Sequence, residues 1–400
     1  MTTGDIDIII VNFKSQSDTR MALDGLGRWS QGRVWVVDNS EDAAEATGLA
    51  TLLAGMPWAT LLVSPFNLGF GRACNLAFAQ SRAELVLLLN PDARIGLAEI
   101  DVLAGALRAD AGLAGVAPVM YWNEPRTFVV PHTVAQTPGT ALATLLRSRW
   151  RGLARHSAAA ALVRMRAILT SRVVLPVDFL TGAVLLLRRE AVVAADGLFD
   201  PRYFMFFEDS DLSLRLRRGG WRLGVVPTAQ AVHTYRHRPF KSELMGQARR
   251  QYFAACYPNF FRLTDGLSRL DSLTRPVPVA RWFRTVQQVL TSAEGFAAAT
   301  GSSAVLAWSP SLLMHPAIFR PDPACASGFS AAEWALLEPG AYVSLLRSDR
   351  DAPQWWYFEV GRRDCGPKGS DSDRCAEPSS QPTPKTAAGR FNENVRRPSG

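Results

Sequence analysis

The stretch LVLLLNPDA, residues 85–93, decides the fold predicted for this chain. Its five apolar residues, Leu85–Leu89, have the length and continuous apolar character of a strand that is covered on both faces of a sheet. Asn90, Pro91 and Asp92 follow at once. Ligands of open parallel sheets bind at the carboxyl ends of the strands, so Asp92 lies where a ligand would bind. The same three residue types are common in turns without function, and this stretch alone leaves both interpretations open.

The same pattern recurs through the first 120 residues. Four further apolar runs are expected as buried strands: Asp7–Val11, Val34–Val37, Leu61–Val63 and Val116–Val119. The segments between them, such as Ser17–Trp29 and Gly71–Arg82, are long enough for a helix each. Asn12 follows the first strand, and Asp38 and Asn39 follow the second. Alternating strands and helices predict a doubly wound α/β sheet with polar clusters at its carboxyl edge.

A second group of acids follows an aromatic run. We expect a strand over 178–187, a helix over Ser210–Arg218, a short strand over 223–226 and a helix over Phe240–Phe261. Glu208, Asp209 and Asp211 come directly after the aromatic run 203–207. Acids in the first turn and arginines in the last turn complement the helix dipole, which explains these charges without a function. Alternatively, the aromatic run carries the carboxylates to the rim of an apolar cavity, where a raised pKa suits a general base.

Composition and charge exclude several classes of protein. No apolar run reaches the 18 or so residues of a membrane-spanning helix, the N-terminal stretch lacks the basic region of a secretory signal, and the five cysteines form no CxxC pair. These features predict a cytoplasmic protein. Net charge is +8, and no acid lies between Glu124 and Asp178, where eight arginines fall. Residues 138–172 are therefore expected as one or two basic amphipathic helices that bind phosphate groups, either of nucleic acid or of a lipid surface.

Two further motifs have limited specificity. His233 and His237 are one helical turn apart, but no HExxH pattern is present, so an autonomous zinc site is not expected. NLGFGRACN, residues 67–75, resembles a dinucleotide fingerprint, yet Cys74 occupies the third glycine position and the motif does not follow the first strand. A nicotinamide oxidoreductase is therefore weakly supported. The glycines still suit a chain that opens a helix near a phosphate.

Taken in order, seven motifs resemble a family 2 glycosyltransferase of the bacterial rhamnosyltransferase-like group. They are IIIVNF (8–13), VVDNS (36–40), NLGFGRACN (67–75), LLLNPDA (87–93), DFLTGAVLLLRRE (178–190), GLFDPRYFMFFEDSDLSLRLRRGGWRL (197–223) and VHTYRH (232–237). The resemblance implies a GT-A fold, a mixed α/β sheet with helices on both faces. It also implies inverting transfer of a sugar from a nucleoside diphosphate donor in one displacement.

The resemblance also implies roles for particular residues. Asp209 matches the general base, with Glu208 and Asp211 as supporting residues. Asp92 matches the last acid of the metal motif, and His233 matches a histidine that completes the metal or diphosphate site, with Mg²⁺ or Mn²⁺ as the ion. Asn90 stands where the motif usually has its first acid, which leaves one carboxylate for the metal. The donor-binding residues would be Asn12, Asp38, Asn39, Asn67, Arg72, Asn75 and Asn90.

The implied partners are a dTDP-rhamnose donor and a glycan or polyprenyl-diphosphate-linked glycan acceptor in cell-surface polysaccharide assembly. Arg147–Arg172 would contact the inner membrane face as a peripheral site, and nucleic acid is not expected because interleaved aromatic residues are missing. A catalytically inactive glycan-binding scaffold with the same fold is the alternative. The expected organisation is a nucleotide-sugar-binding half at 1–125, an acceptor-binding half at 126–262, a helical linker at 263–300, a small Trp-rich β-like appendage at 301–363 and a disordered tail at 364–400.

Overall fold

The structure is a computed structural model, and it describes residues 5–130, 134–234, 241–273, 284–285, 290–295, 304–309, 318–319, 329–337, 340–347 and 354–361. The tail predicted at 364–400 and His237 lie outside these residues.

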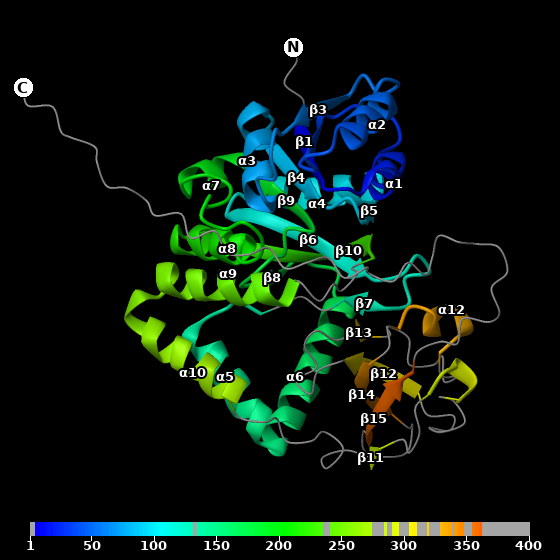
Figure 1. Cartoon of the computed structure of the whole chain (residues 1–400), viewed down its shortest axis with the longest axis vertical. Coiled ribbons are helices and arrows are strands. Elements are labelled where there is room, and N and C mark those ends of the chain that lie inside the picture. The colour runs from blue at the N-terminus through cyan, green and yellow to red at the C-terminus, as the bar shows by residue number, and fades with distance from the viewer. Residues whose placement is uncertain are drawn as a thin grey trace, which may run out of the picture. The chain divides into compact units, whose positions relative to one another are not determined.

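A mixed sheet forms the centre of the molecule (Figure 1). Its parallel part follows the order β3-β2-β1-β4, with the bounds β1 (Ile6–Asn12), β2 (Val34–Asp38), β3 (Ala59–Val63) and β4 (Leu85–Leu89). The next strand, β9 (Val184–Arg188), is antiparallel to both β4 and β6 (Leu113–Tyr121). β10 (Arg222–His233) then lies parallel to β6. The mixed sheet expected for the fold class is therefore confirmed.

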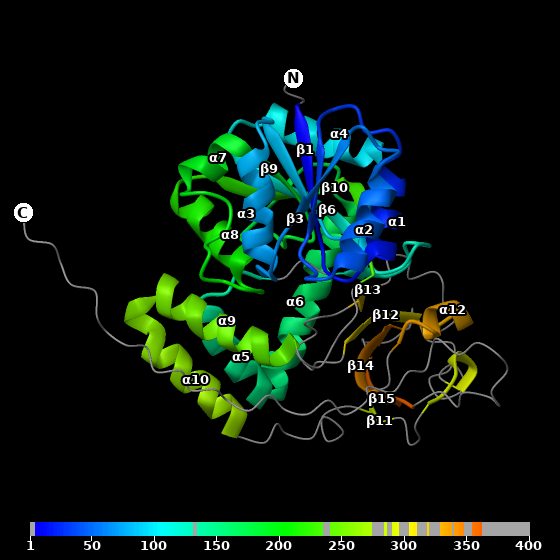
Figure 2. The ribbon, with the colours of Figure 1, turned by 45° about the horizontal axis from the view of Figure 1, so that its top comes forward.

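Helices cover both faces of this sheet (Figure 2). One face carries α1 (Gln16–Leu26), α2 (Ala43–Leu53) and α4 (Leu97–Ala109), and the other carries α3 (Phe70–Gln80), α7 (Arg189–Ala194) and α8 (Glu208–Arg218). Side chains of a strand alternate between faces, so Ile8 packs in the cluster with Leu23 while Ile9 packs in the cluster with Leu212. All seven residues of β1 are buried, as its continuous apolar sequence predicts.

Short elements and a helical group complete the first 273 residues. The short strands are β5 (Ala93–Ile95), β7 (Val129–Val130) and β8 (Leu175–Val177). The basic helices predicted within 138–172 are present as α5 (Pro138–Arg149) and α6 (Arg151–Thr170). The predicted helix Phe240–Phe261 is α9 (Lys241–Cys256), followed by the 3₁₀ turn η1 (Pro258–Phe260) and by α10 (Phe261–Leu273). Among the described helices, none is long and apolar enough to cross a membrane.

The C-terminal part is rich in strands, as expected. It contains β11 (Arg284–Thr285), β12 (Ala304–Ser309), β13 (Ile318–Phe319), α12 (Ala331–Trp334), β14 (Gly340–Arg347) and β15 (Gln354–Val360). Phe319 of β13 pairs with Val129 of β7, so these strands continue the central sheet. The helical linker expected at 263–300 is wrong at Arg284–Thr285, which pairs with β15. Pro276 and Pro278 lie just before this pair, and proline interrupts a helix.

Three element bounds in the second half differ from the sequence prediction. The strand expected over 178–187 begins only at Val184, because the preceding N–H groups bond to α8 rather than to a neighbouring strand. The helix expected from Ser210 begins at Glu208. The strand expected over 223–226 runs on to His233, past a register shift between Val226 and Gln230 that interrupts its apolar pattern.

Candidate active site

The carboxyl ends of β1 and β2 are joined by a buried polar network. Asn12 Nδ2 donates to Asp38 Oδ1 at 3.3 Å, to Ser40 Oγ at 3.2 Å and to Glu45 Oε1 at 3.0 Å. Its Oδ1 accepts from Thr19 Oγ1 at 2.9 Å. Asp38 is only 1% exposed, so its place at the end of β2 is fixed by these contacts. The structure therefore brings Asn12 and Asp38 together, as the strand-end pattern predicted.

Asn39 holds the turn that precedes α3. Its Nδ2 donates to Asn67 Oδ1 at 2.9 Å, and its Oδ1 accepts from the Leu68 amide at 2.7 Å. The Gly69 amide also donates to Asn67 Oδ1 at 2.9 Å. Both asparagines thus shape the Asn67–Gly69 turn, and their predicted contact with a donor stays a prediction.

Asp92 and His233 meet at the carboxyl end of β4. Because β5 pairs antiparallel with the end of β10, His233 lies opposite Ala93, and its Nε2 is 3.1 Å from Asp92 Oδ1. The side chain of His233 is 11% exposed and that of Asp92 is 32% exposed. Thr234, 142 residues after Asp92, donates to the Asp92 carbonyl through its amide at 3.1 Å and its hydroxyl at 3.2 Å. The sequence predicted Asp92 and His233 but gave no signal for Thr234, which acts on a backbone atom.

The residues at this end of β4 fit a divalent cation that also binds a diphosphate. Asp92 supplies a carboxylate and His233 an imidazole, and the buried Oδ1 of Asn90 has no hydrogen-bond partner within the protein. Among the described residues, no group of three or more His, Cys, Asp or Glu side chains could hold an ion by itself. Mg²⁺ is commonly held by one or two carboxylates together with substrate phosphates, so a small protein ligand set suits that arrangement.

Asp209 lies at the start of α8 and is held by backbone amides. Gly182 N donates to Asp209 Oδ2 at 3.4 Å, and Ser210 N donates to Asp209 Oδ1 at 2.7 Å. The residue after Gly182, Ala183, accepts from the Asn90 amide at 2.8 Å. Gly182 and Ala183 therefore connect Asp209 to the turn that carries Asp92. The sequence did not identify Gly182 as a site residue, because its contribution is a backbone N–H.

The two carboxyl groups of Glu208 and Asp209 have raised pKa values. Burial, with a smaller contribution from the Asp209 charge, raises the pKa of Glu208 to about 8. Burial also raises the pKa of Asp209 to about 6, although hydrogen bonds from Gly182 and Ser210 oppose the shift. Glu208 is 6% exposed, and its Oε2 has no hydrogen-bond partner. The two neighbouring carboxyl groups titrate as a pair, and burial disfavours two negative charges there at neutral pH.

Asp211 faces away from this pair. Its Oδ2 accepts from Arg215 Nε at 2.7 Å, and its Oδ1 accepts from Cys256 Sγ at 3.4 Å. Arg215 also donates to the carbonyls of Gly197 at 2.9 Å and Leu198 at 2.8 Å. Asp211 was expected to support catalysis or bind acceptor hydroxyls, and that role stays a prediction. These contacts fasten α8 to α9 and, through Arg215, to residues 197–198.

Arg72 and Asn75 contact a loop of the chain. Arg72 Nε donates to the Pro201 carbonyl at 2.7 Å, and Asn75 exchanges two hydrogen bonds with the backbone of Phe199, at 2.7 and 3.0 Å. Both were predicted to bind the donor, and that role stays a prediction. These contacts hold α3 against residues 199–201. A polar side chain that bonds to a distant carbonyl carries the same sequence signal as one that binds a ligand.

A glycine places the loop before α8 on the first turn of α3. Gly69 has φ +77°, and a Cβ there would overlap the carbonyl oxygen of Phe204, which accepts from the Phe70 amide at 2.9 Å. Phe206 and Phe207 also have positive φ, at 71° and 65°. Non-glycine residues in this region are strained, and such strain gathers at functional sites.

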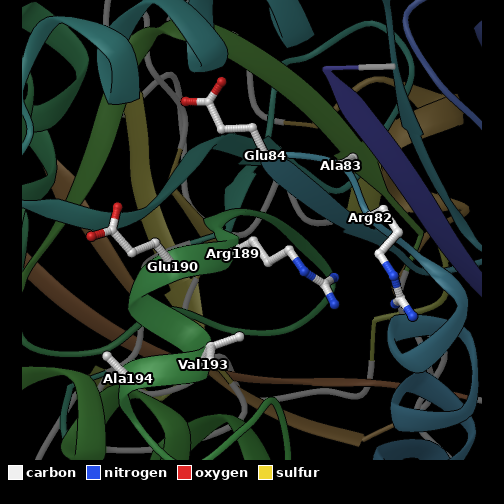
Figure 3. A pocket seen from close by; sticks show the side chains of 7 residues that line it. All are labelled: Arg82, Ala83, Glu84, Arg189, Glu190, Val193 and Ala194. Atoms are coloured by element: carbon white, nitrogen blue, oxygen red, sulfur yellow. The ribbon is translucent and has the colours of Figure 1, made fainter. Parts of the chain in front are cut away.

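A pocket lined by Arg82, Glu84, Arg189 and Glu190 lies at the opposite end of β4 (Figure 3). In this view the carboxyl groups of Glu84 and Glu190 point away from the guanidinium groups of Arg82 and Arg189. Arg82 donates to the carbonyls of Ala79 and Ser81, and Arg189 donates to that of Phe78, so both arginines cap the end of α3. This pocket is therefore not the site formed at the carboxyl ends of the strands.

Comparison with known proteins identifies the family of this chain. The model of the family described as glycosyltransferase like family 2 matches residues 4–254, which run from β1 into α9. The chain belongs to this family. The predicted family and the predicted enzyme class, a glycosyltransferase, are confirmed at the level of that family.

Two curated relatives are rhamnosyltransferases. The N-acetylglucosaminyl-diphospho-decaprenol L-rhamnosyltransferase of Mycobacterium tuberculosis (strain H37Rv) is 31% identical over 195 residues, which are 45% of this chain and 60% of that protein. Rhamnosyltransferase WbbL of Escherichia coli (strain K12) is 25% identical over 237 residues, 58% of this chain and 83% of that protein. The chain thus spans about three fifths of the length of the mycobacterial relative.

Solved structures that match part of this chain include two that contain Mn²⁺. GalNAc-T7 with UDP, GalNAc and Mn²⁺ is 12% identical, with a TM-score of 0.44 and coverage of 64% of this chain and 51% of that chain. The mannosyltransferase PcManGT of Pyrobaculum calidifontis with GDP-Man and Mn²⁺ is 14% identical, with a TM-score of 0.41 and coverage of 70% and 79%.

Proposed function

We propose that this glycosyltransferase moves a sugar from a nucleoside diphosphate donor to a glycan acceptor with inversion, in one displacement. One observation carries the proposal. The Gly182–Ala183 backbone joins the carboxylate of Asp209 to the Asn90–Asp92 turn, at which His233 also lies. The proposed proton acceptor and the proposed diphosphate-binding groups are thereby linked through two hydrogen bonds to the same two-residue segment.

Asp209 is the proposed general base. The acceptor hydroxyl is a poor nucleophile and must lose its proton as it attacks, so a carboxylate has to lie within hydrogen-bond reach. A pKa raised to about 6 keeps Asp209 ionised at neutral pH while making it a stronger base than an exposed aspartate. Glu208, neutral at the same pH, avoids a second negative charge beside the base.

The donor binds, in this proposal, along the carboxyl ends of β1, β2 and β4. Asn12 and Asp38 form the nucleoside end, and the turn held by Asn39 and Asn67 opens α3 toward the phosphates. Asn90, Asp92 and His233 hold Mg²⁺ or Mn²⁺ at the diphosphate. The ion would supply Lewis-acid stabilisation of the leaving nucleoside diphosphate, which gains charge in the transition state.

The proposed donor is dTDP-rhamnose, and the proposed acceptor is a polyprenyl-diphosphate-linked glycan of cell-surface polysaccharide assembly. The names of both curated relatives contain rhamnosyltransferase, and the mycobacterial one also names a diphospho-decaprenol acceptor. The basic segment Arg147–Arg172 supports such an acceptor, because it suits peripheral contact with an anionic membrane.

The test combines donor binding with transfer. Nucleoside diphosphate sugars are screened by thermal shift with and without Mn²⁺, and transfer to a polyprenyl-diphosphate-linked acceptor is then measured for the wild type, Asp209→Asn and Asp24→Asn. Asp24 is an exposed carboxylate on α1 and serves as the matched control. We expect Asp209→Asn to lose roughly 10²–10⁴-fold in turnover while its donor-induced shift survives. Full turnover in this variant would remove Asp209 from the role of base, and binding of glycans without transfer of any donor would favour an inactive scaffold.

A further inference from the structure

The corner between α5 and α6 presents a tryptophan to solvent. Trp150 is the single residue between the two helices and has an extended backbone conformation, with φ −120° and ψ 109°. Its amide donates to the Leu146 carbonyl at 3.0 Å, and its carbonyl accepts from Ala154 N at 3.0 Å. The N–H of Trp150 thus bonds to α5 and its carbonyl bonds to α6, and these two bonds fix the shape of the corner. The Trp150 side chain nevertheless remains 60% exposed.

The helices that meet at this corner have two apolar sides. One side faces the protein: Ala141 and Leu145 of α5 and Ala154 of α6 are buried. A second group of apolar side chains is exposed, with Leu142 on α5 and Leu153 on α6. The buried side chains contribute to the core of this chain. The exposed leucines and Trp150 do not, so folding does not account for their apolar character.

The same pair of helices carries basic residues. Arg164, Arg166 and Arg172 are exposed on α6 and just after it. The sequence from 125 to 177 contains eight arginines and no acid, so α5 and α6 themselves carry only positive formal charges. A second copy of these helices would be repelled by them, whereas an anionic lipid surface complements them, with each basic residue near the surface strengthening binding by about fivefold.

We propose that the α5–α6 corner inserts Trp150 into the headgroup region of an anionic membrane, with the exposed leucines beside it and the arginines of α6 on lipid phosphates. Tryptophan is enriched at this depth because its ring is apolar and its N–H remains hydrogen-bonded. This inference deepens the proposed function, since a lipid-linked acceptor lies in the same membrane. Vesicle binding tests it without relying on sugar transfer.

The experiment measures co-sedimentation of the full chain with vesicles of phosphatidylcholine alone or mixed with phosphatidylglycerol. The variants are Trp150→Ser and the pair Arg164→Glu with Arg166→Glu. Their matched controls are Val193→Ser, an exposed apolar residue on α7, and Arg20→Glu with Arg28→Glu, two exposed arginines on or near α1. The wild type should bind only the anionic vesicles. Loss of two basic residues should weaken that binding by at least about 25-fold. Trp150→Ser should weaken it at every salt concentration, because its contribution is apolar and is not screened.

Several outcomes would overturn the inference. These are equal binding of both vesicle types by the wild type, unchanged binding of Trp150→Ser, and a loss in the control variants as large as in the test variants. If sedimentation velocity shows that Trp150→Ser dissociates a dimer, the corner joins two copies of the chain instead. A protein that binds anionic vesicles through Trp150 but transfers no sugar would retain this inference and lose the proposed function.

Discussion

Replacement of Glu208 by Gln distinguishes the roles of the two carboxyl groups at the start of α8. If Glu208 is neutral in the native protein, glutamine reproduces its shape and polarity, and the Glu208→Gln variant should retain most of the wild-type turnover. Asp209→Asn, one residue away, should lose roughly 10²–10⁴-fold because the proton acceptor itself is removed. The turnover of these two variants is thus expected to differ by orders of magnitude, although the substitutions are adjacent and nearly isosteric.

The size of the stability effect follows from the pKa of Glu208. It is about 8 in the native protein against an ordinary value of 4.5, so the native state holds a proton that the unfolded state has lost. The free energy of unfolding therefore falls as pH rises from 4.5 to 8, by about 1.4 kcal/mol per pH unit for this group. By pH 7 Glu208 has lowered the free energy of unfolding by about 3 kcal/mol. The Glu208→Gln variant should lack this decrease, because glutamine does not ionise.

The assay is denaturant unfolding of the wild type and Glu208→Gln at several pH values between 5 and 8, combined with a pH–rate profile of transfer. Glu208→Gln should be the more stable protein at pH 7 and show a shallower decline with pH. Its acidic limb of activity should remain near pH 6, because the raised pKa of Asp209 comes chiefly from burial and not from Glu208. The alkaline limb near pH 8, where Glu208 ionises beside Asp209, should disappear.

Two results would refute this reasoning. Loss of activity in Glu208→Gln as severe as in Asp209→Asn would show that the Glu208 carboxylate itself takes part in the reaction. An unchanged dependence of unfolding on pH would show that Glu208 is ionised in the native protein. Circular dichroism of both variants establishes that each is folded.

Two further predictions concern the metal site and the turn before α3. Asp92→Ala should abolish the part of the donor-induced thermal shift that depends on Mn²⁺, because one carboxylate carries most of the negative charge there; an unchanged metal dependence would place the ion elsewhere. Gly69→Ala should lower the free energy of unfolding by at least about 2 kcal/mol in a urea titration, because φ +77° and the Phe204 carbonyl both oppose a side chain. Gly105→Ala is the matched control, since a Cβ in this part of α4 meets nothing within 4 Å and should stabilise the helix by about 0.5–1 kcal/mol. Equal effects of the two alanines would contradict the role of Gly69.

Local sequence patterns predicted the parallel part of the fold well. The apolar runs of β1, β2 and β4 are continuous because both faces of each strand are covered, and this leaves a strong signal. The strand-end positions of Asp38 and Asp92 followed from the same pattern. For Asp209 the group of acids after an aromatic run left two interpretations open, and only the resemblance to family 2 glycosyltransferases implied its role as the base.

Long-range pairing was the part that local patterns could not supply. The contact of His233 with Asp92 depends on β10 continuing past a register shift and then pairing with the three-residue strand β5. Neither feature produces a periodic apolar signal. The contributions of Gly182 and Thr234 were also missed, because the amide of any non-proline residue could donate the same bond.

The aromatic run before α8 has a structural cause that also explains its position. Tyr203 is fully buried, and Phe207 packs against Tyr252 with ring centroids 5.3 Å apart. These contacts offset the strain of two consecutive residues at positive φ, which costs of the order of 1–3 kcal/mol each. Glu208 packs against Gly71: a Cβ added to Gly71 would lie 3.6 Å from the Glu208 Cβ. A relaxed backbone at Phe206 and Phe207 would direct the chain elsewhere and would not bring Glu208 to this place. The aromatic packing thus holds the carboxyl pair in a buried place, and this burial raises the pKa of Asp209, as suits the base proposed for it.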